Sequence, residues 1–187
     1  MQHKQTILIY LIGTPGTGKY TIAQEFAKAG YIVCDNQLVN NPIFTLLNYD
    51  GFLKIPEYAW DSIGAIRNVI LDFIANEPHQ HYVLTNVLYE DEGDRRLFTH
   101  VEAVASKRGA LFIPVKLLIS EEENKKRIVN PERRQRWKSI NPADASTENV
   151  LISIEHPHVL ELEVTHLTPA HAAEEILAHI KKIKERP

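Results

Sequence analysis

Short apolar runs alternate along the chain with longer segments in which apolar residues recur every three or four positions. The runs predict five strands, at residues 6–12, 31–34, 82–88, 110–119 and 159–164. The periodic segments predict helices at residues 20–29, 57–76, 94–107 and from 169 onward, with further helical stretches at 36–48, after Ser120 and around 147–154. Strands that alternate with helices indicate an α/β fold, in which a parallel sheet is covered by helices on both faces.

Two prolines interrupt these patterns. Pro42 follows Asn41 within the helical stretch 36–48 and predicts a break and a restart of the helix, because a proline disfavours helical geometry in the residue before it. Pro114 lies inside the fourth apolar run, where its missing N–H predicts a bulge or a late start of strand pairing.

Length and composition limit the class of protein. The 187 residues fit one domain, residues 1–187, with a lid at about 124–146, and the net charge of −3 gives no general footprint for nucleic acid. Cys34 is the single cysteine, which excludes an internal disulfide and fits a reducing compartment. Residues 1–5 run into the first strand without a signal-peptide pattern, and no apolar stretch reaches the roughly 18 residues of a membrane span. We therefore expect a cytoplasmic monomer or homodimer without a membrane partner.

A glycine-rich stretch stands between the first predicted strand and the first predicted helix. It reads Gly13-Thr14-Pro15-Gly16-Thr17-Gly18-Lys19-Tyr20-Thr21. A strand, such a loop and a helix in this order are typical of a nucleotide phosphate-binding loop. The glycines permit the loop to turn its backbone N–H groups toward an anion, and the helix start adds further unpaired N–H groups. Lys19 would add a positive charge at the β- and γ-phosphates.

Tyr20 departs from the usual pattern of this loop. Its position normally carries the Ser or Thr hydroxyl that ligates Mg²⁺, and a phenol oxygen lies too far from the backbone to copy that hydroxyl. Thr21 is the next hydroxyl, although its direction on the helix differs by about 100°. Phosphate binding is therefore indicated, and Thr21 and Asp35 are the candidate metal residues, acting through water.

Three polar residues near predicted strand ends are candidates for binding an acceptor molecule. Asp35 follows the second strand, where a carboxylate could take the proton of an attacking hydroxyl, or could instead form an Asx turn. Asn86 stands at the end of the third strand, in place of the acid common there, and could bind a ligand or cap the strand. Arg67, on the helix 57–76, could clamp a polar acceptor or pair with a local acid at the surface.

A basic segment, residues 124–140, stands out in a chain that is otherwise net negative. It carries Lys125, Lys126, Arg127, Arg133, Arg134, Arg136 and Lys138. Guanidinium groups on a mobile flap could neutralise a transferred phosphoryl group and exclude water, and Arg127, Arg133 and Arg134 are the favoured candidates. An RNA-binding strip is the alternative, although Trp137 is the only aromatic residue interleaved with the cations.

These features resemble the small P-loop kinases, such as shikimate kinase, gluconate kinase and chloramphenicol phosphotransferase, which are also grouped as AAA-type ATPase domains. The resemblance rests on the stretch from Gly13 to Lys19, on Asp35, on the arginine-rich segment 127–138 and on the five-strand alternation. It implies a three-layer P-loop NTPase fold with strand order 2-3-1-4-5, an Arg-rich lid, and ATP with Mg²⁺ as cofactors. It also implies that Lys19 and the loop amides hold the phosphates, that Asp35 is the base or acceptor anchor, and that Arg127 and Arg133 close as the lid.

The favoured function is therefore an ATP-dependent phosphotransferase that acts on a hydroxyl of a small molecule held between Asp35, Arg67 and residues 36–60. A nucleotide-binding module with weakened chemistry, serving as a sensor or partner-binding protein, is a second hypothesis. A kinase for nucleic-acid 5′-hydroxyl groups is a third, disfavoured by the acidic composition.

Overall fold

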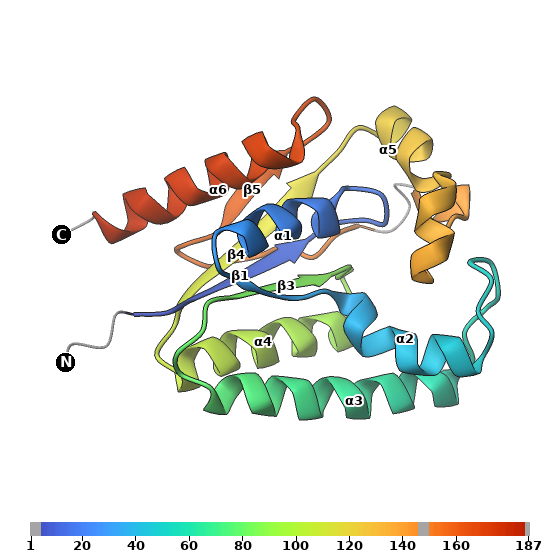
Figure 1. The fold of residues 1–187 in the computed structure, drawn as a ribbon, viewed down its shortest axis with the longest axis horizontal. Helices are drawn as coiled ribbons and strands as arrows, with labels where there is room; N and C mark the ends of the chain where they lie inside the picture. Colours follow the sequence, from blue (N-terminus) through green and yellow to red (C-terminus); the bar gives the residue numbers. More distant parts are fainter. Residues whose placement is uncertain (1–4, 146–149, 186–187) are drawn as a thin grey trace.

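The strand β1 (Ile7–Ile12) forms the centre of the sheet and is buried on both faces. The computed structural model describes residues 5–145 and 150–185 (Figure 1). Its five parallel strands lie in the order β2-β3-β1-β4-β5, which confirms the order implied by the resemblance. The other strands are β2 (Ile32–Cys34), β3 (Tyr82–Asn86), β4 (Leu111–Leu118) and β5 (Leu160–Glu163).

Helices cover both faces of the sheet and form three layers with it (Figure 1). The helices α1 (Lys19–Lys28) and α6 (Pro169–Lys184) pack on one face, and α3 (Glu57–Asn76) and α4 (Glu92–Lys107) pack on the other. A hydrophobic core lies on each face of the sheet, and alternate residues of β1 belong to one or the other. Ile7, Ile9 and Leu11 pack in the core with α1 and α6. Leu8, Tyr10 and Ile12 pack in the core with α3 and α4. This double burial explains why β1 is a continuous apolar run rather than an alternating one.

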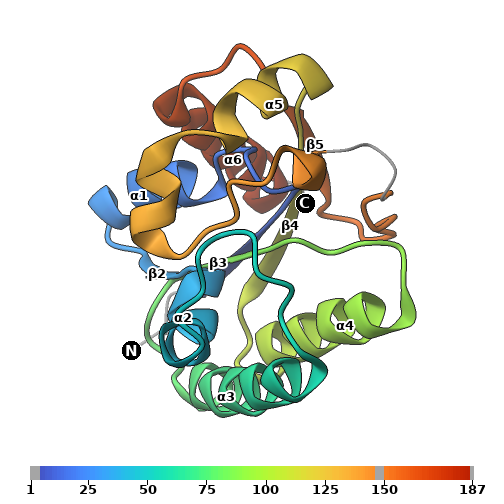
Figure 2. The same ribbon diagram turned by 90° about the vertical axis from the view of Figure 1, so that its right-hand side faces the viewer.

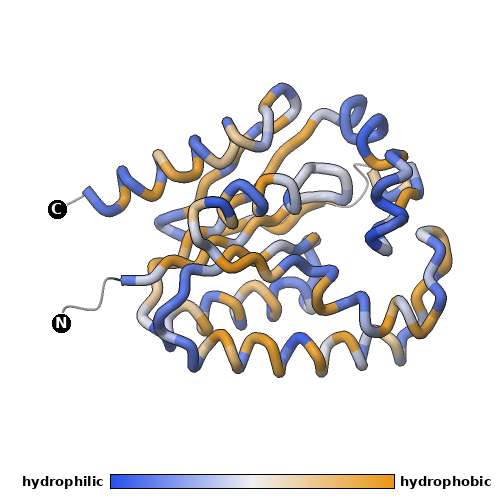
Figure 3. Tube along the Cα trace, viewed as in Figure 1, coloured by the Kyte–Doolittle hydropathy of each residue, from blue (hydrophilic) through white to orange (hydrophobic). Residues whose placement is uncertain are grey.

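The remaining helices lie beyond the carboxyl ends of the strands. They are α2 (Asn36–Leu46), α5 (Glu121–Ile128) and the short 3₁₀ helices η1 (Pro131–Arg136) and η2 (Pro142–Ala145). Figure 2 shows this edge of the sheet, and Figure 3 shows that α5 and η1 are mostly hydrophilic, in contrast to the apolar strands. Within residues 5–145 and 150–185, no helix combines the length and the apolar character needed to cross a membrane.

The helix starts follow local sequence signals. The Ser120 hydroxyl accepts a hydrogen bond from the Glu123 N–H at 3.4 Å, and the Thr168 hydroxyl accepts one from the His171 N–H at 3.2 Å. Both caps satisfy N–H groups that have no partner within the helix, and they fix where α5 and α6 begin.

Three expectations about local structure need correction. The helix α2 runs through Pro42 without a break, because Val39 and Phe44 on either side of it are buried against α3. Pro114 pairs in register with Tyr10 of β1 without a bulge, so the expectation is wrong on that side; on the β5 side the late start is confirmed, because pairing begins at the residue after Pro114. The helix expected around 147–154 falls partly outside the described residues, and residues 150–154 are not helical.

Candidate active site

The glycine-rich loop joins β1 to α1 and has the backbone geometry that its sequence predicts. Gly16 and Gly18 have φ angles of 99° and 89°, a region that side chains with a Cβ disfavour. A Cβ on Gly16 would also lie 2.0 Å from Oδ1 of Asn124, a residue of α5. The Asn124 amide donates to the Thr14 hydroxyl at 3.0 Å, so α5 holds the outer side of the loop.

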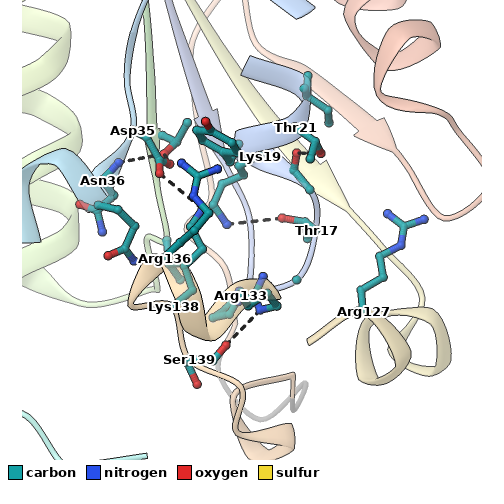
Figure 4. A pocket seen from close by; sticks show the side chains of 18 of the residues that line it. Thr17, Lys19, Thr21, Asp35, Asn36, Arg127, Arg133, Arg136, Lys138 and Ser139 are labelled. Atoms are coloured by element: carbon teal, nitrogen blue, oxygen red, sulfur yellow. Dashed lines mark hydrogen bonds and ion pairs between the residues drawn. The ribbon is translucent and has the colours of Figure 1, made fainter. Parts of the chain in front are cut away.

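Lys19 begins α1, and its side chain turns back into the loop. Its Nζ donates to the carbonyls of Gly13 and Thr14 at 2.6 and 2.8 Å, next to the Thr17 hydroxyl (Figure 4). Burial lowers the pKa of Lys19 to about 7, and the nearby cations Lys138 and Arg133 act in the same direction. An anion placed here would offset that desolvation and repulsion.

Asp35 stands at the end of β2, on the same edge of the sheet as the loop, and is buried. Its Oδ1 accepts a hydrogen bond from the Thr85 hydroxyl at 2.6 Å, and its Oδ2 lies 3.4 Å from Nζ of Lys138. The Thr85 hydroxyl also accepts the Asn36 N–H at 3.1 Å. β3 therefore fixes the start of α2 and leaves one Asp35 oxygen facing a cation.

Asn36 connects the two other acceptor-site candidates. Its Oδ1 accepts hydrogen bonds from the amide of Asn86 at 3.0 Å and from Nη2 of Arg67 at 3.3 Å. Asn36 and Asn86 line a large cavity, described below, whereas Arg67 lines a much smaller one beside Cys34 and Leu71. Arg67 thus lies behind the two asparagines and holds Asn36 in place.

The basic segment contributes a different set of cations to the cavity than the sequence suggested. Arg133, Arg136 and Lys138 line it, whereas Arg134 is exposed and does not. The reason is the 3₁₀ geometry of η1, in which residues three apart share a face, so that Arg133 and Arg136 point the same way and Arg134 points elsewhere.

Arg127 also lines the cavity but lies apart from these cations in Figure 4. Its Nε donates to the Glu123 carboxylate at 2.8 Å, and its Nη2 donates to the Thr165 carbonyl at 2.9 Å. These bonds tie α5 to the loop after β5. Leu167 and Pro169, which follow that loop, line the same end of the cavity.

A large cavity of about 840 Å³ joins these groups, apart from Arg67 and Arg134. Its phosphate half is lined by the glycine-rich loop, Lys19 and the cations of the basic segment. Its other half, which we call the aromatic half, is lined by Phe44, Tyr49, Ile55, Trp60 and Trp137. Tyr49 packs against Phe44 with ring centroids 4.7 Å apart, and Trp60 meets Phe44 edge-on at 6.0 Å. Sequence reasoning assigned this region to the acceptor but found no motif in it.

The predicted metal residues, Thr21 and Asp35, already have partners within the protein. The Thr21 hydroxyl donates to the Gly18 carbonyl at 2.8 Å, and Asp35 contacts Thr85 and Lys138 as described. Among the described residues, no group of three or more His, Cys, Asp or Glu side chains is placed to hold a metal ion. An Mg²⁺ ion bound directly by Thr21 or Asp35 would have to displace these contacts, and binding of Mg²⁺ through water stays a prediction.

Searches by sequence match no protein-family model and no curated protein. By structure, the chain is similar to a gluconokinase from Sinorhizobium meliloti, with a TM-score of 0.63 and 15% identity over 99% of this chain and 96% of that one. The chain has the P-loop kinase fold. It is also similar to shikimate kinase from Acinetobacter baumannii in complex with shikimate, with a TM-score of 0.55 and 16% identity over 97% and 96% of the two chains. For the APS kinase of Mycobacterium tuberculosis in complex with AMPPNP and APS, the TM-score is 0.55 and the identity 15% over 95% and 98%.

Proposed function

We propose that the protein binds ATP and transfers its γ-phosphoryl group to a hydroxyl of a small-molecule acceptor. The structural neighbours named above are small-molecule kinases, which supports a phosphotransferase. The placement of Lys19, Asp35 and the cations of the basic segment around one cavity supports it most directly. Phosphoryl transfer requires mainly positioning and charge stabilisation, and this cavity offers both.

In the proposed reaction, the loop amides and Lys19 hold the β- and γ-phosphates. Asp35 accepts the proton of the acceptor hydroxyl as its oxygen attacks the γ-phosphorus. The new O–P bond forms, the bond from the γ-phosphorus to the bridging β,γ-oxygen breaks, and ADP leaves with that oxygen's electron pair. Arg133 and Arg136 face the cavity from the basic segment and would neutralise the charge of the transferred group.

The acceptor binds, in this proposal, in the aromatic half of the cavity. Phe44, Tyr49 and Trp60 offer ring faces and edges rather than charged clamps, and Arg67 lies outside this cavity. An acceptor hydroxyl on a molecule with an apolar or aromatic part fits such walls better than a polyhydroxylated acid. Asn36 and Asn86, at the boundary between the halves, are placed to orient the hydroxyl group.

Asp35→Asn tests the proposed base. Phosphoryl transfer is followed by ³¹P NMR of ATP with a panel of aromatic and aliphatic alcohols, and with water alone as the acceptor. The variant keeps an oxygen for the Thr85 hydroxyl, so we expect ATP binding to persist while transfer slows by about a hundredfold or more. An unchanged rate of transfer would exclude Asp35 as the base.

Tyr20 and Asn86 favour one second candidate, a nucleotide-binding module with weakened chemistry. They replace the hydroxyl and the acid that P-loop enzymes commonly use. Tyr20→Ser distinguishes the two functions: a sharp gain in ATP consumption would indicate that the native site is impaired.

A further inference from the structure

Tyr20 contacts the basic segment through its ring face. The guanidinium carbon of Arg136 lies 3.2 Å from the ring centroid, and Nζ of Lys138 lies 4.8 Å from it. Both distances are within the range of cation–π attraction. The residue that departs from the usual phosphate-loop pattern is therefore a platform for two cations that come from more than a hundred positions further along the chain.

Lys138 is held from two sides at the centre of the site. Its ammonium lies 3.4 Å from Oδ2 of Asp35 (Figure 4). The same ammonium lies 4.8 Å from the centroid of the Tyr20 ring. The Lys138 and Asp35 side chains are only 17% and 10% exposed. Asp35 is fixed in turn by Thr85, so the position of the ammonium is set by β2, β3 and α1 together.

Lys138 is also close to the phosphate-binding groups. Lys138 and Lys19 line the same cavity, and the charge of Lys138 contributes to lowering the pKa of Lys19. Among the described residues that line the cavity, five cationic side chains, Lys19, Arg127, Arg133, Arg136 and Lys138, face three carboxylates, Asp35, Glu132 and Asp144. This surplus of positive charge would attract a polyphosphate.

We propose that Lys138 takes the place of a protein-held Mg²⁺ in this site. Its ammonium, oriented by Asp35 and by the Tyr20 ring, contacts the β- and γ-phosphates, so that ATP binds without a divalent cation. This inference rests on the proposed function, because it concerns the same nucleotide. It explains why the metal-ligating hydroxyl is replaced by an aromatic ring: the ring positions a lysine, which a short hydroxyl side chain cannot do.

The experiment is a calorimetric titration with ATP, carried out in excess EDTA and again in excess Mg²⁺. We expect the wild-type dissociation constants to agree within about threefold, which is less than about 0.7 kcal/mol. Lys138→Met is expected to weaken binding in EDTA by about tenfold or more, the size of one charge-assisted hydrogen bond, and by less in Mg²⁺. Lys126→Met is the matched control, because Lys126 lies exposed on α5, where it pairs with Glu122.

Tyr20 is tested as a positioning residue by two variants. Tyr20→Ala should weaken ATP binding in EDTA more than in Mg²⁺, because Lys138 and Arg136 lose their platform, and Tyr20→Phe should restore the loss. Thermal melts of each variant separate these effects from unfolding. Equal losses in EDTA and Mg²⁺ for Tyr20→Ala would contradict the positioning role.

The outcomes separate this inference from the proposed function. Wild-type binding that is tenfold or more tighter with Mg²⁺, or EDTA binding that Lys138→Met leaves unchanged, would overturn the role of Lys138 and leave the ATP-binding function intact. Failure to bind ATP in either condition would overturn both.

Discussion

The two halves of the cavity are built in different ways. In the phosphate half, the shape of the loop is set mainly by the backbone, because Gly16 and Gly18 have positive φ angles. The start of α1 has no side-chain cap, so its first N–H groups are available to an anion. In the aromatic half, side chains from α2, from α3 and from the loop between them, together with Trp137 after η1, supply the walls. Backbone geometry demands particular residues at fixed spacing, whereas an aromatic wall can be assembled from many sequences. This difference explains why the phosphate half has a recognisable sequence motif and the aromatic half has none.

The largest effect should come from removing the charge within the phosphate half. Lys19→Ala is expected to weaken ATP binding by about a hundredfold or more, since charge-assisted hydrogen bonds contribute about 1.5–3 kcal/mol each. Calorimetry measures the loss. Lys28→Ala, on the exposed side of the same helix, is the control and should bind like wild type. Equal affinities for the two variants would mean that the phosphates lie elsewhere.

A substitution at Gly16 tests the dependence of this half on backbone geometry. Gly16→Ala and Gly30→Ala both place a Cβ at a positive φ, at a cost of about 1–2 kcal/mol in the free energy of unfolding. Only Gly16→Ala also meets Asn124, whereas a Cβ on Gly30 has nothing within 4 Å. We expect Gly16→Ala to be the less stable variant in chemical denaturation and to bind ATP about tenfold more weakly, a change of about 1.4 kcal/mol. Identical behaviour of the two variants would contradict the loop's dependence on α5.

The aromatic half should respond through the acceptor and not through ATP. Trp60→Ala is expected to raise the KM for an aromatic alcohol acceptor by about three- to tenfold, since an aromatic contact contributes about 0.5–1.5 kcal/mol. The Kd for ATP should stay constant. Val69→Ala, on the solvent side of α3, is the matched control. A change in ATP affinity without a change in acceptor KM would assign Trp60 to the phosphate half.

The smallest effect is a proton taken up when ATP binds. The pKa of Lys19 is about 7, so at pH 8 most of this amine is neutral, and bound phosphate favours its charged form and raises that pKa. Binding should therefore take up roughly half to one proton at pH 8 and weaken as the pH rises above 7. Titrations in two buffers of different ionisation enthalpy measure the uptake. Lys19→Arg should reduce it, because arginine stays protonated; an unreduced uptake would assign the proton to another group.

The sequence predicted the sheet well, and the reasons for its failures are physical. The strands, the phosphate loop and the caps at Ser120 and Thr168 depend on neighbours in sequence. The continuity of α2 through Pro42 depends instead on burial against α3, which local propensity does not contain. The sequence favoured Arg134, whereas η1 brings Arg136 to the cavity instead, because Arg136 shares a face with Arg133. Thr85 and Lys138 meet Asp35 only through the fold, from positions up to about a hundred residues apart.

A calorimetric comparison of ATP with AMP, on the wild-type protein, tests most directly whether the glycine-rich loop and Lys19 bind the β- and γ-phosphates. One ATP site is expected, with AMP bound about a hundredfold more weakly, because AMP lacks the phosphates that Lys19 contacts. Equal affinities for ATP and AMP, or no binding of ATP, would contradict the account.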